Sequence, residues 1–187
     1  MRTEERWNST FRQTVIKASF SPRIQRDLLT LPNMVNDETI ESTYIYGKTG
    51  TGKTILAAQM MLQEMKNQYL EKPGAVTGFE FVNFADMLAS IRYTYSSQQG
   101  NTEKDKLQTY MDCGMLVIDD FGSSRTTDWV TDILYQIINA RYENLGKTII
   151  TCNHSLDQLE IRLADQRITS RIDRMCKIVE KLPYGKS

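Results

Sequence analysis

The chain has 187 residues, enough for one compact domain with a substantial core. Hydrophobic residues make up 40% of the sequence and charged residues 25%, as in ordinary globular proteins. Basic and acidic residues number 23 each, so the net charge is zero. This balance excludes a global basic field for nucleic acid, and any such contact must come from a local patch.

The sequence also limits the cellular compartment and the metal chemistry. No apolar run approaches the length that crosses a bilayer, and the charged first residues contain no signal-peptide core. Cys113, Cys152 and Cys176 are odd in number and lack a C-x-x-C pairing, which indicates reduced thiols. The sole histidine, His154, cannot by itself form a zinc site or a nucleophilic triad. We therefore expect a cytoplasmic protein with no membrane partner.

The N-terminal part of the chain changes character near residue 20. Residues 1–20 form a polar segment of mixed charge with scattered aromatic side chains. Ser21-Pro22 is typical of an N-cap followed by a first-turn proline, and it predicts a helix that continues to Leu31. We expect the domain proper to cover 21–187.

The rest of the chain alternates between expected strands and expected helices. Short apolar or β-branched runs that stop at turn residues predict strands, and apolar residues at helical spacing predict helices. The expected strands are 43–46, 78–82, 115–118, 147–151 and 176–182; helices are expected from the glycine loop to about 70, from Asn83 onward, at 128–144 and at 164–175, with an exposed loop at 96–102. Strands separated by helices predict a parallel sheet covered on both faces.

A glycine-rich segment between the first of these strands and its helix matches G-x-x-x-x-G-K-[ST] in full. The glycines let the backbone turn tightly and aim several N–H groups at one point, where the helix dipole adds positive potential. Lys53 can then neutralise the outer phosphates of ATP, and the Thr54 hydroxyl can hold Mg²⁺. A chance match is the alternative, and the strand–helix context argues against it. The residues assigned to ATP binding are Gly47, Lys48, Thr49, Gly50, Thr51, Gly52, Lys53, Thr54 and Ile55.

Two aspartates and an asparagine stand at the ends of expected buried strands. Asp119 follows the apolar run 115–118, and a carboxylate there is costly to bury unless a cation compensates it. We assign Asp119, together with Thr54, to the metal site. Asp120 is assigned to positioning the attacking water, with capping of the next turn as the alternative. Asn153 either bonds the γ-phosphate or water, or serves only as a turn residue.

Two arginines, Arg167 and Arg171, are four residues apart within an expected helix, so their guanidinium groups lie on one helix face. One interpretation is a solvated basic face. The other is an arginine finger that reaches the nucleotide of a neighbouring subunit, which requires self-association through the ATP sites. Composition does not choose between the two.

A local patch for nucleic acid is predicted at Arg92, Tyr93 and Tyr95, with Lys104 and Lys106 nearby. Aromatic side chains stack on bases while neighbouring cations contact phosphates. The alternative is that the tyrosines are partly buried packing residues of a helix. The three residues at 92, 93 and 95 are the candidate nucleic-acid contacts.

Taken in chain order, these motifs resemble the AAA+ ATPase domain of the bacterial DnaC/DnaI replicative-helicase loaders. Walker A at Gly47–Thr54, Walker B ending in Asp119-Asp120, a sensor asparagine at Asn153 and a box with Arg171 occur in the family's order. The resemblance covers the chain from about residue 20. Phe121-Gly122, Asp128-Trp129 and Tyr142-Glu143-Asn144-Leu145 are further similarities.

The resemblance implies an α/β P-loop NTPase of AAA+ type, with a five-stranded parallel sheet in the order 5-1-4-3-2, helices on both faces and no C-terminal helical lid. It implies that Asn153 is sensor 1 and that Arg171 is the finger, supported by Arg167, with Arg174 as an alternative. Relatives bind single-stranded DNA through a helical element after the second strand, which corresponds here to 83–110.

Two departures from the family affect the expected activity. Many AAA+ proteins have Asp-Glu in Walker B, whereas this chain has Asp119-Asp120, so slow hydrolysis is expected. The loaders usually carry a helicase-binding domain ahead of the ATPase, which the polar residues 1–20 cannot replace. We therefore expect either a fragment or a minimal relative of the phage or mobile-element type.

These features lead to one leading hypothesis: a helicase-loader ATPase of DNA replication that binds ATP and Mg²⁺ and self-associates. Its partners would be a DnaB-type replicative helicase and single-stranded DNA. One alternative is a transposition-helper ATPase of the IstB type, which shares these motifs. Another is an adaptor that binds nucleotide without hydrolysing it, for which the departure at Asp120 is the cue.

Overall fold

The computed structural model describes residues 3–33, 35, 39–73, 76–96 and 102–182. In this part of the chain, the strands form one parallel sheet in the order β2-β3-β4-β1-β5, which confirms the expected order 5-1-4-3-2. β4 therefore lies between the strand that leads into the glycine loop and the strand that ends in the aspartate pair. The strands are β1 (Thr43–Tyr46), β2 (Phe79–Asn83), β3 (Met115–Phe121), β4 (Lys147–Cys152) and β5 (Lys177–Glu180).

Helices connect the strands and also precede the first one. The predicted helices are confirmed as α3 (Pro22–Thr30), α4 (Lys53–Glu71), α5 (Phe84–Ser96), α7 (Asp128–Glu143) and α9 (Gln166–Met175). The sequence did not predict α1 (Thr3–Arg6), the π-helix η1 (Trp7–Phe11), α2 (Arg12–Ser19) or α8 (Leu156–Leu163). α6 (Thr102–Asp112) lies largely within the helical element at 83–110 that the resemblance implied.

The predicted loop at 96–102 is wrong at both of its ends. Ser96 is the last residue of α5, and Thr102 is the first residue of α6. The remaining residues of that prediction, 97–101, lie outside the described part of the chain, as do 183–187, to which the expectation about a C-terminal lid refers.

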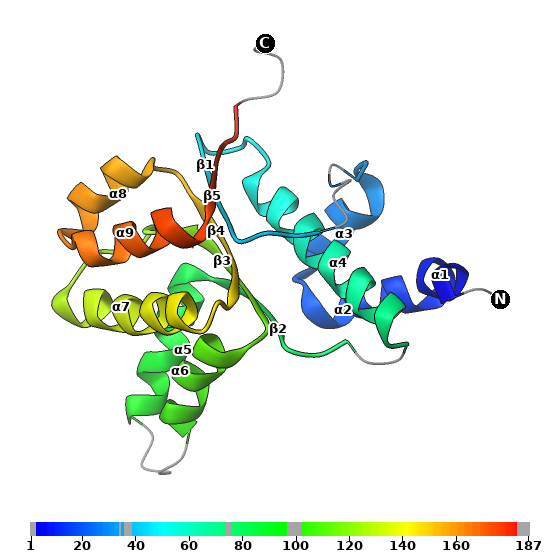
Figure 1. The fold of residues 1–187 in the computed structure, drawn as a ribbon, viewed down its shortest axis with the longest axis horizontal. Coiled ribbons are helices and arrows are strands. Elements are labelled where there is room, and N and C mark those ends of the chain that lie inside the picture. The colour runs from blue at the N-terminus through cyan, green and yellow to red at the C-terminus, as the bar shows by residue number, and fades with distance from the viewer. Residues whose placement is uncertain (1–2, 34, 36–38, 74–75, 97–101, 183–187) are drawn as a thin grey trace.

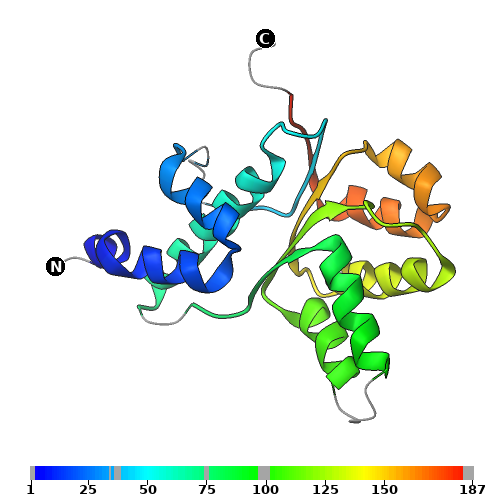
Figure 2. The ribbon, with the colours of Figure 1, turned by 180° about the vertical axis from the view of Figure 1, so that it is seen from behind.

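Each face of the sheet carries its own hydrophobic cluster, because alternate strand residues point to opposite sides. On β3, Leu116 and Ile118 pack against α5–α9, whereas Met115 and Val117 pack against α2–α4. Figure 1 shows these two groups of helices on opposite sides of the sheet, and Figure 2 shows the same arrangement from behind. The apolar run of β3 is thus buried on both faces, as predicted for a central parallel strand.

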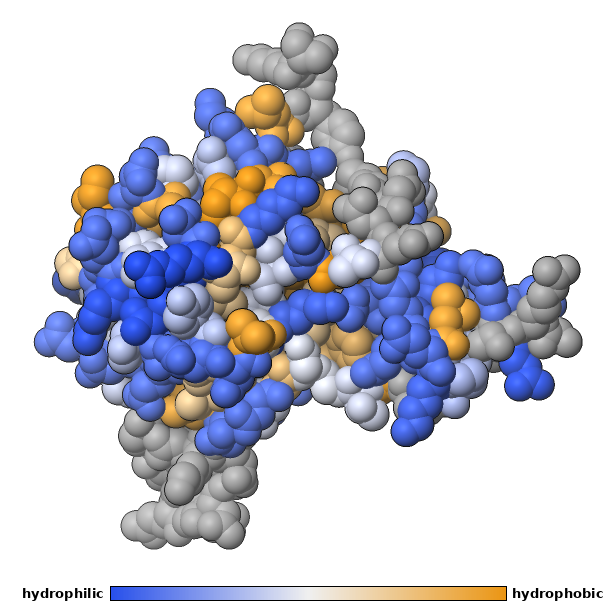
Figure 3. Space-filling model, viewed as in Figure 1, coloured by the Kyte–Doolittle hydropathy of each residue, from blue (hydrophilic) through white to orange (hydrophobic). Residues whose placement is uncertain are grey.

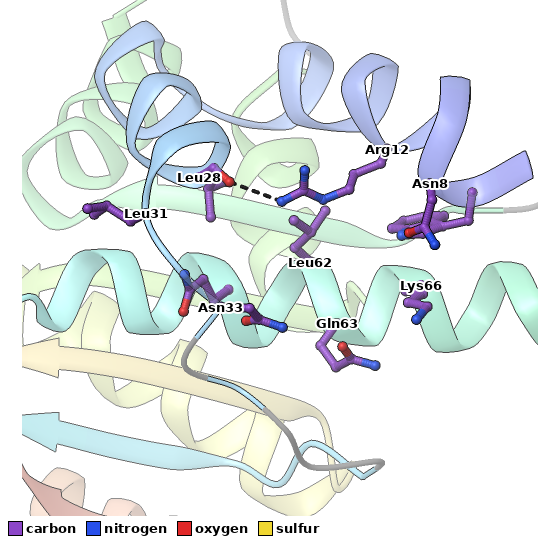
Figure 4. Close-up of a pocket in the computed structure, with 10 residues that line it drawn as sticks. Asn8, Arg12, Leu28, Leu31, Asn33, Leu62, Gln63 and Lys66 are labelled. Atoms are coloured by element: carbon purple, nitrogen blue, oxygen red, sulfur yellow. Dashed lines mark hydrogen bonds between the residues drawn. The ribbon is translucent and has the colours of Figure 1, made fainter. Parts of the chain in front are cut away.

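The N-terminal segment is part of this core, although its polar composition did not indicate it. Trp7 and Phe20 are buried in the cluster that surrounds α4, and the Trp7 ring lies 5.5 Å from the ring of Tyr69. Figure 4 shows α2 and α3 lying over α4, where Arg12 donates to the Leu28 carbonyl at 3.0 Å beside a cavity of about 190 Å³. A boundary at residue 20 stays a prediction, while the packing joins both sides of it in one hydrophobic cluster.

The described residues also bear on the expectations about membrane-spanning helices and cysteines. Among them, no helix combines the length and the apolar character that crossing a membrane requires. The three cysteines are free, as predicted, and Cys152 and Cys176 are buried.

Candidate functional site at the edge of the sheet

The glycine-rich segment forms the loop between β1 and α4. Gly47, Gly50 and Gly52 have φ angles of 147°, 82° and 86°, a region that side chains disfavour. A Cβ atom at Gly47 would also overlap the carbonyl oxygen of Lys181, just after β5. Because α4 begins at Lys53, the loop leads directly into a helix N-terminus, whose N–H groups and dipole attract anions. The backbone therefore has the form expected of a phosphate-binding loop.

Lys53 is buried within this loop, with 7% of its surface exposed. Its Nζ donates to the carbonyls of Gly47 and Lys48 at 2.8 and 2.9 Å, and to Oδ1 of Asn153 at 2.9 Å. Burial lowers the pKa of Lys53, and nearby acidic groups, Asp120 first, act in the opposite direction. The ammonium group is thus held by neutral oxygen atoms, and phosphate oxygens can replace them as stronger, charged acceptors.

Asp119 lies at the end of β3 within hydrogen-bond distance of two hydroxyl groups. Thr54 on α4 and Thr151 on β4 both donate to its Oδ1, at 2.8 and 2.7 Å. No described residue donates a hydrogen bond to its second oxygen, Oδ2. A hydroxyl and a carboxylate beside a phosphate loop are hard oxygen ligands, and Mg²⁺ binds such a pair together with water and substrate phosphates.

A closed metal cage is absent from the described ranges. In them, no three His, Cys, Asp or Glu side chains lie close enough together to hold a metal ion. The donor pair of Thr54 and Asp119 instead fits a cation that keeps most of its ligands from solvent and nucleotide, which is how Mg²⁺ is usually bound. The metal assignment made from the sequence therefore fits the residues present, and it stays a prediction.

Asp120 and Asn153 complete the same edge. Nδ2 of Asn153 donates to Oδ1 of Asp120 at 3.0 Å, while its Oδ1 accepts the hydrogen bond from Lys53. Asp120 has a φ angle of 58°, a left-handed conformation that is uncommon for residues other than glycine. The structure thus brings together Lys53, Asp119, Asp120 and Asn153, which lie far apart in the sequence. Their catalytic roles stay predictions.

A cavity of about 740 Å³ opens at this edge, lined by Lys53, Thr54, Asp119, Asp120 and Asn153 among others. The rest of its wall comes from the corner between α2 and α3 and from the junction of β2 and α5. Sequence reasoning missed this second wall, because packing of the N-terminal helices brings it there and no local motif marks it. Its polar residues are Ser19, Ser21, Arg23, Asp27, Asn83 and Asp86.

The two arginines of α9 lie on one face of that helix, as predicted. Both guanidinium groups stack over the ring of Tyr135 on α7, at 4.4 Å for Arg167 and 5.0 Å for Arg171. Arg171 also donates to Oδ1 of Asn139 at 2.6 Å, and Arg167 pairs with Asp165 at 2.7 Å. Among the described residues that line the cavity, neither arginine is present. In Figure 3 the most hydrophilic residues of this face gather over α9 and α7.

The candidate nucleic-acid residues lie near the end of α5. Arg92 is exposed and stacks over the ring of Trp129, 4.6 Å from its centroid, and Tyr93 is 74% exposed. The tyrosine at 93 is therefore not a packing residue. The side chain of Tyr95 lies outside what the structure describes. Figures 1 and 2 show α5 and α6 side by side at one end of the sheet.

Comparisons with known proteins agree with this geometry. The model of the family described as IstB-like ATP binding protein matches residues 8–186. The chain is similar to the replicative helicase loader DnaI of Bacillus subtilis strain 168, at 25% identity over 75% of this chain and 42% of that protein. It is also similar to a putative ATP-binding protein of insertion sequence IS5376 from Geobacillus stearothermophilus, at 28% identity over 84% of this chain and 57% of that protein. The chain spans about half the length of these curated relatives.

A solved structure shows the same fold. The crystal structure of the DnaC helicase loader matches with a TM-score of 0.61 and 28% identity, and the match covers 86% of each chain. The fold is thus that of an AAA+ P-loop NTPase, and the resemblance that the motifs indicated is confirmed.

Proposed function

This chain belongs to the family of IstB-like ATP binding proteins, and from this premise we propose that it is an ATPase of the helicase-loader type. One observation carries the ATPase proposal: the Asn153 amide joins Lys53 to Asp120. A cation for the γ-phosphate and a carboxylate for the attacking water thereby belong to one hydrogen-bonded group. Such fixed positions are the main contribution that a protein makes to phosphoryl transfer.

Each residue of the edge has a defined part in the proposed reaction. Lys53 leaves its loop carbonyls to bind the outer phosphates, and the loop N–H groups hold the phosphate chain. Thr54 and Asp119 would hold Mg²⁺, which would neutralise charge on the phosphate oxygens. Asp120 orients the attacking water and accepts its proton, while Asn153 holds the Asp120 carboxylate toward the γ-phosphate.

The active site is proposed to need a second copy of the chain. Arg171 does not line the cavity of its own subunit, and it is presented on α9, on the opposite face of the sheet from α4. In an assembly, its guanidinium would reach the nucleotide of a neighbour and stabilise charge in the transition state. ATP binding would then favour association, and hydrolysis would weaken it.

The loader role rests on similarity to the helicase loader DnaI and to the structure of the DnaC helicase loader. By this proposal the partners are a replicative helicase and single-stranded DNA. Arg92 and Tyr93 supply a cation and an exposed ring at the end of α5, which suits contact with phosphate and base.

Phosphate release from ATP tests the ATPase proposal. Asp120→Asn keeps an oxygen that accepts from Asn153 but removes the charge, so turnover should fall about 100-fold while nucleotide affinity is retained. Asp86→Asn, which changes a carboxylate that lines the same cavity, is the matched control and should retain turnover. If the wild-type protein releases no phosphate even with single-stranded DNA present, the ATPase proposal is rejected in favour of an adaptor that binds nucleotide without hydrolysing it.

A transposition-helper ATPase is the second candidate function, and the family match and the insertion-sequence relative favour it. Capture experiments with and without ATP separate the two. ATP-dependent capture of a replicative helicase supports the loader. Capture of a transposase, with turnover stimulated by double-stranded DNA, supports the transposition helper and rejects the loader.

A further inference from the structure

β3 departs from regular pairing where it reaches the site. Its register against β4 is interrupted between Ile118 and Phe121. Within this interruption, Asp119 and Asp120 both lie opposite Thr151, which is the arrangement of a β-bulge. The bulge coincides with the left-handed backbone of Asp120. Both aspartates of the site therefore depend on how this irregularity is held.

Thr151 holds the bulge with a single hydroxyl group. Its Oγ1 accepts the backbone N–H of Asp120 at 2.9 Å and donates to Oδ1 of Asp119 at 2.7 Å. The residue is 1% exposed, so both hydrogen bonds are largely shielded from water. One buried hydroxyl thus fixes the backbone of one aspartate and the carboxylate of the other.

We infer that Thr151 is a positioning residue for the magnesium site: its hydroxyl orients the Asp119 carboxylate and holds the bulge that presents Asp120. The inference rests on the proposed binding of Mg²⁺ and ATP at this edge. With Oδ1 held by Thr151 and Thr54, the carboxylate of Asp119 is fixed at the wall of the cavity that the phosphate loop also lines. Hydrogen bonds that orient a ligand carboxylate in this way raise metal affinity by about 10- to 100-fold.

A purely structural role is the competing explanation, because any buried hydroxyl with two partners stabilises the fold. Thr148 provides the comparison on the same strand. It is also fully buried, and its Oγ1 accepts from Arg141 at 2.7 Å and donates to the Gly146 carbonyl at 2.8 Å. Thr148 is near the start of β4, whereas Thr151 is near its end, at the site.

The test titrates Mg²⁺ into protein with a fluorescent ATP analogue and records thermal melting of the same samples. Thr151→Val replaces the hydroxyl with a methyl group and should raise the Mg²⁺ concentration for half-maximal binding about 10-fold. Binding in EDTA should change less than about 2-fold, because the phosphate loop is intact. Thr151→Ser keeps the hydroxyl and should retain the wild-type Mg²⁺ requirement. Thr151→Ala should repeat the shift, so the result does not depend on one variant folding.

Thr148→Val is the matched control and should lower the melting temperature without changing the Mg²⁺ requirement. An unchanged requirement in Thr151→Val and Thr151→Ala would overturn the inference, as would an equal shift in Thr148→Val or in Thr151→Ser. Failure of the proposed function looks different: the wild-type protein itself would then bind the analogue with no dependence on Mg²⁺, or not bind it.

Discussion

Two regions of this molecule hold cationic side chains in different surroundings. The first region is the sheet edge beside the glycine loop, called the phosphate edge below. Lys53 is buried there, and its Nζ is held by three oxygen atoms of its own subunit. On α9, Arg167 and Arg171 stack on the surface of Tyr135 and stay at least partly exposed. Lys53 is thus enclosed at the wall of the cavity, whereas Arg167 and Arg171 are presented on one face of α9. This difference is the one that the proposed function requires, with Lys53 acting within its own subunit and Arg171 acting on a neighbour.

The largest expected effect concerns the enclosed cation. Lys53→Ala should lower ATP affinity about 1,000-fold and abolish turnover, because two or more charge-assisted hydrogen bonds to phosphate are lost. Equilibrium binding of a fluorescent ATP analogue measures this. Lys72→Ala is the control, since that lysine is exposed just after α4 and is not among the described residues that line the cavity. Normal ATP binding by Lys53→Ala would remove the site assignment.

The displayed cations should behave in the opposite way. Arg171→Ala should leave the ATP affinity of the isolated subunit unchanged and lower turnover about 1,000-fold at protein concentrations where subunits associate. Steady-state phosphate release over a range of protein concentrations measures this. Arg174→Ala, on the same helix, tests the alternative finger. A loss in Arg174→Ala with normal turnover in Arg171→Ala would transfer the role to Arg174.

The smallest expected effect concerns the ion pair between Asp165 and Arg167, which positions one of the two arginines of α9. The hydrogen bond from Arg167 lowers the pKa of Asp165 below its ordinary value of 3.8. A lowered folded-state pKa means that the pairing stabilises the fold above the ordinary value and that this contribution is lost as pH falls through the lowered one. Asp165→Asn keeps the acceptor for the Arg167 backbone N–H, so the melting temperature should fall only about 1–2 °C at pH 7.

Thermal melting at neutral and at strongly acidic pH measures this effect. The difference between Asp165→Asn and wild type should disappear at the acidic pH, where both side chains are uncharged. Asp173→Asn, an exposed acid on the same helix, should show no comparable difference. If Asp165→Asn lowers the melting temperature equally at both values of pH, the charge of Asp165 does not account for its pairing with Arg167.

The phosphate edge was largely predictable from sequence, because its signals are local. The loop motif names Lys53 and Thr54 directly, and an aspartate after an apolar run is conspicuous wherever the run lies in the sheet. The strand order came from the resemblance, and it correctly placed Asn153 between the other two strands. Each of these inferences needed only one short stretch of sequence or the order of several motifs along the chain.

Other parts of the site depend on contacts that no short stretch contains. In the sequence, Thr151 is an ordinary β-branched strand residue. Only the bulge in the neighbouring strand brings its hydroxyl into hydrogen-bond contact with both aspartates. Trp7 lies in a polar segment, and its burial depends on α4 being there to cover it. Arg92 stacks on Trp129, from a helix that begins after the next strand. Tertiary packing decides all three.

Gly47 and its strand also have a consequence for how the chain is made. β1 pairs with β4 on one side and β5 on the other, and Gly47 rests against the carbonyl of Lys181. During synthesis, β1 leaves the ribosome long before either neighbour exists. The loop at Gly47 lacks this packing contact until Lys181 has emerged, so we expect the candidate nucleotide site to form late, after the N-terminal helices have begun to pack on α4.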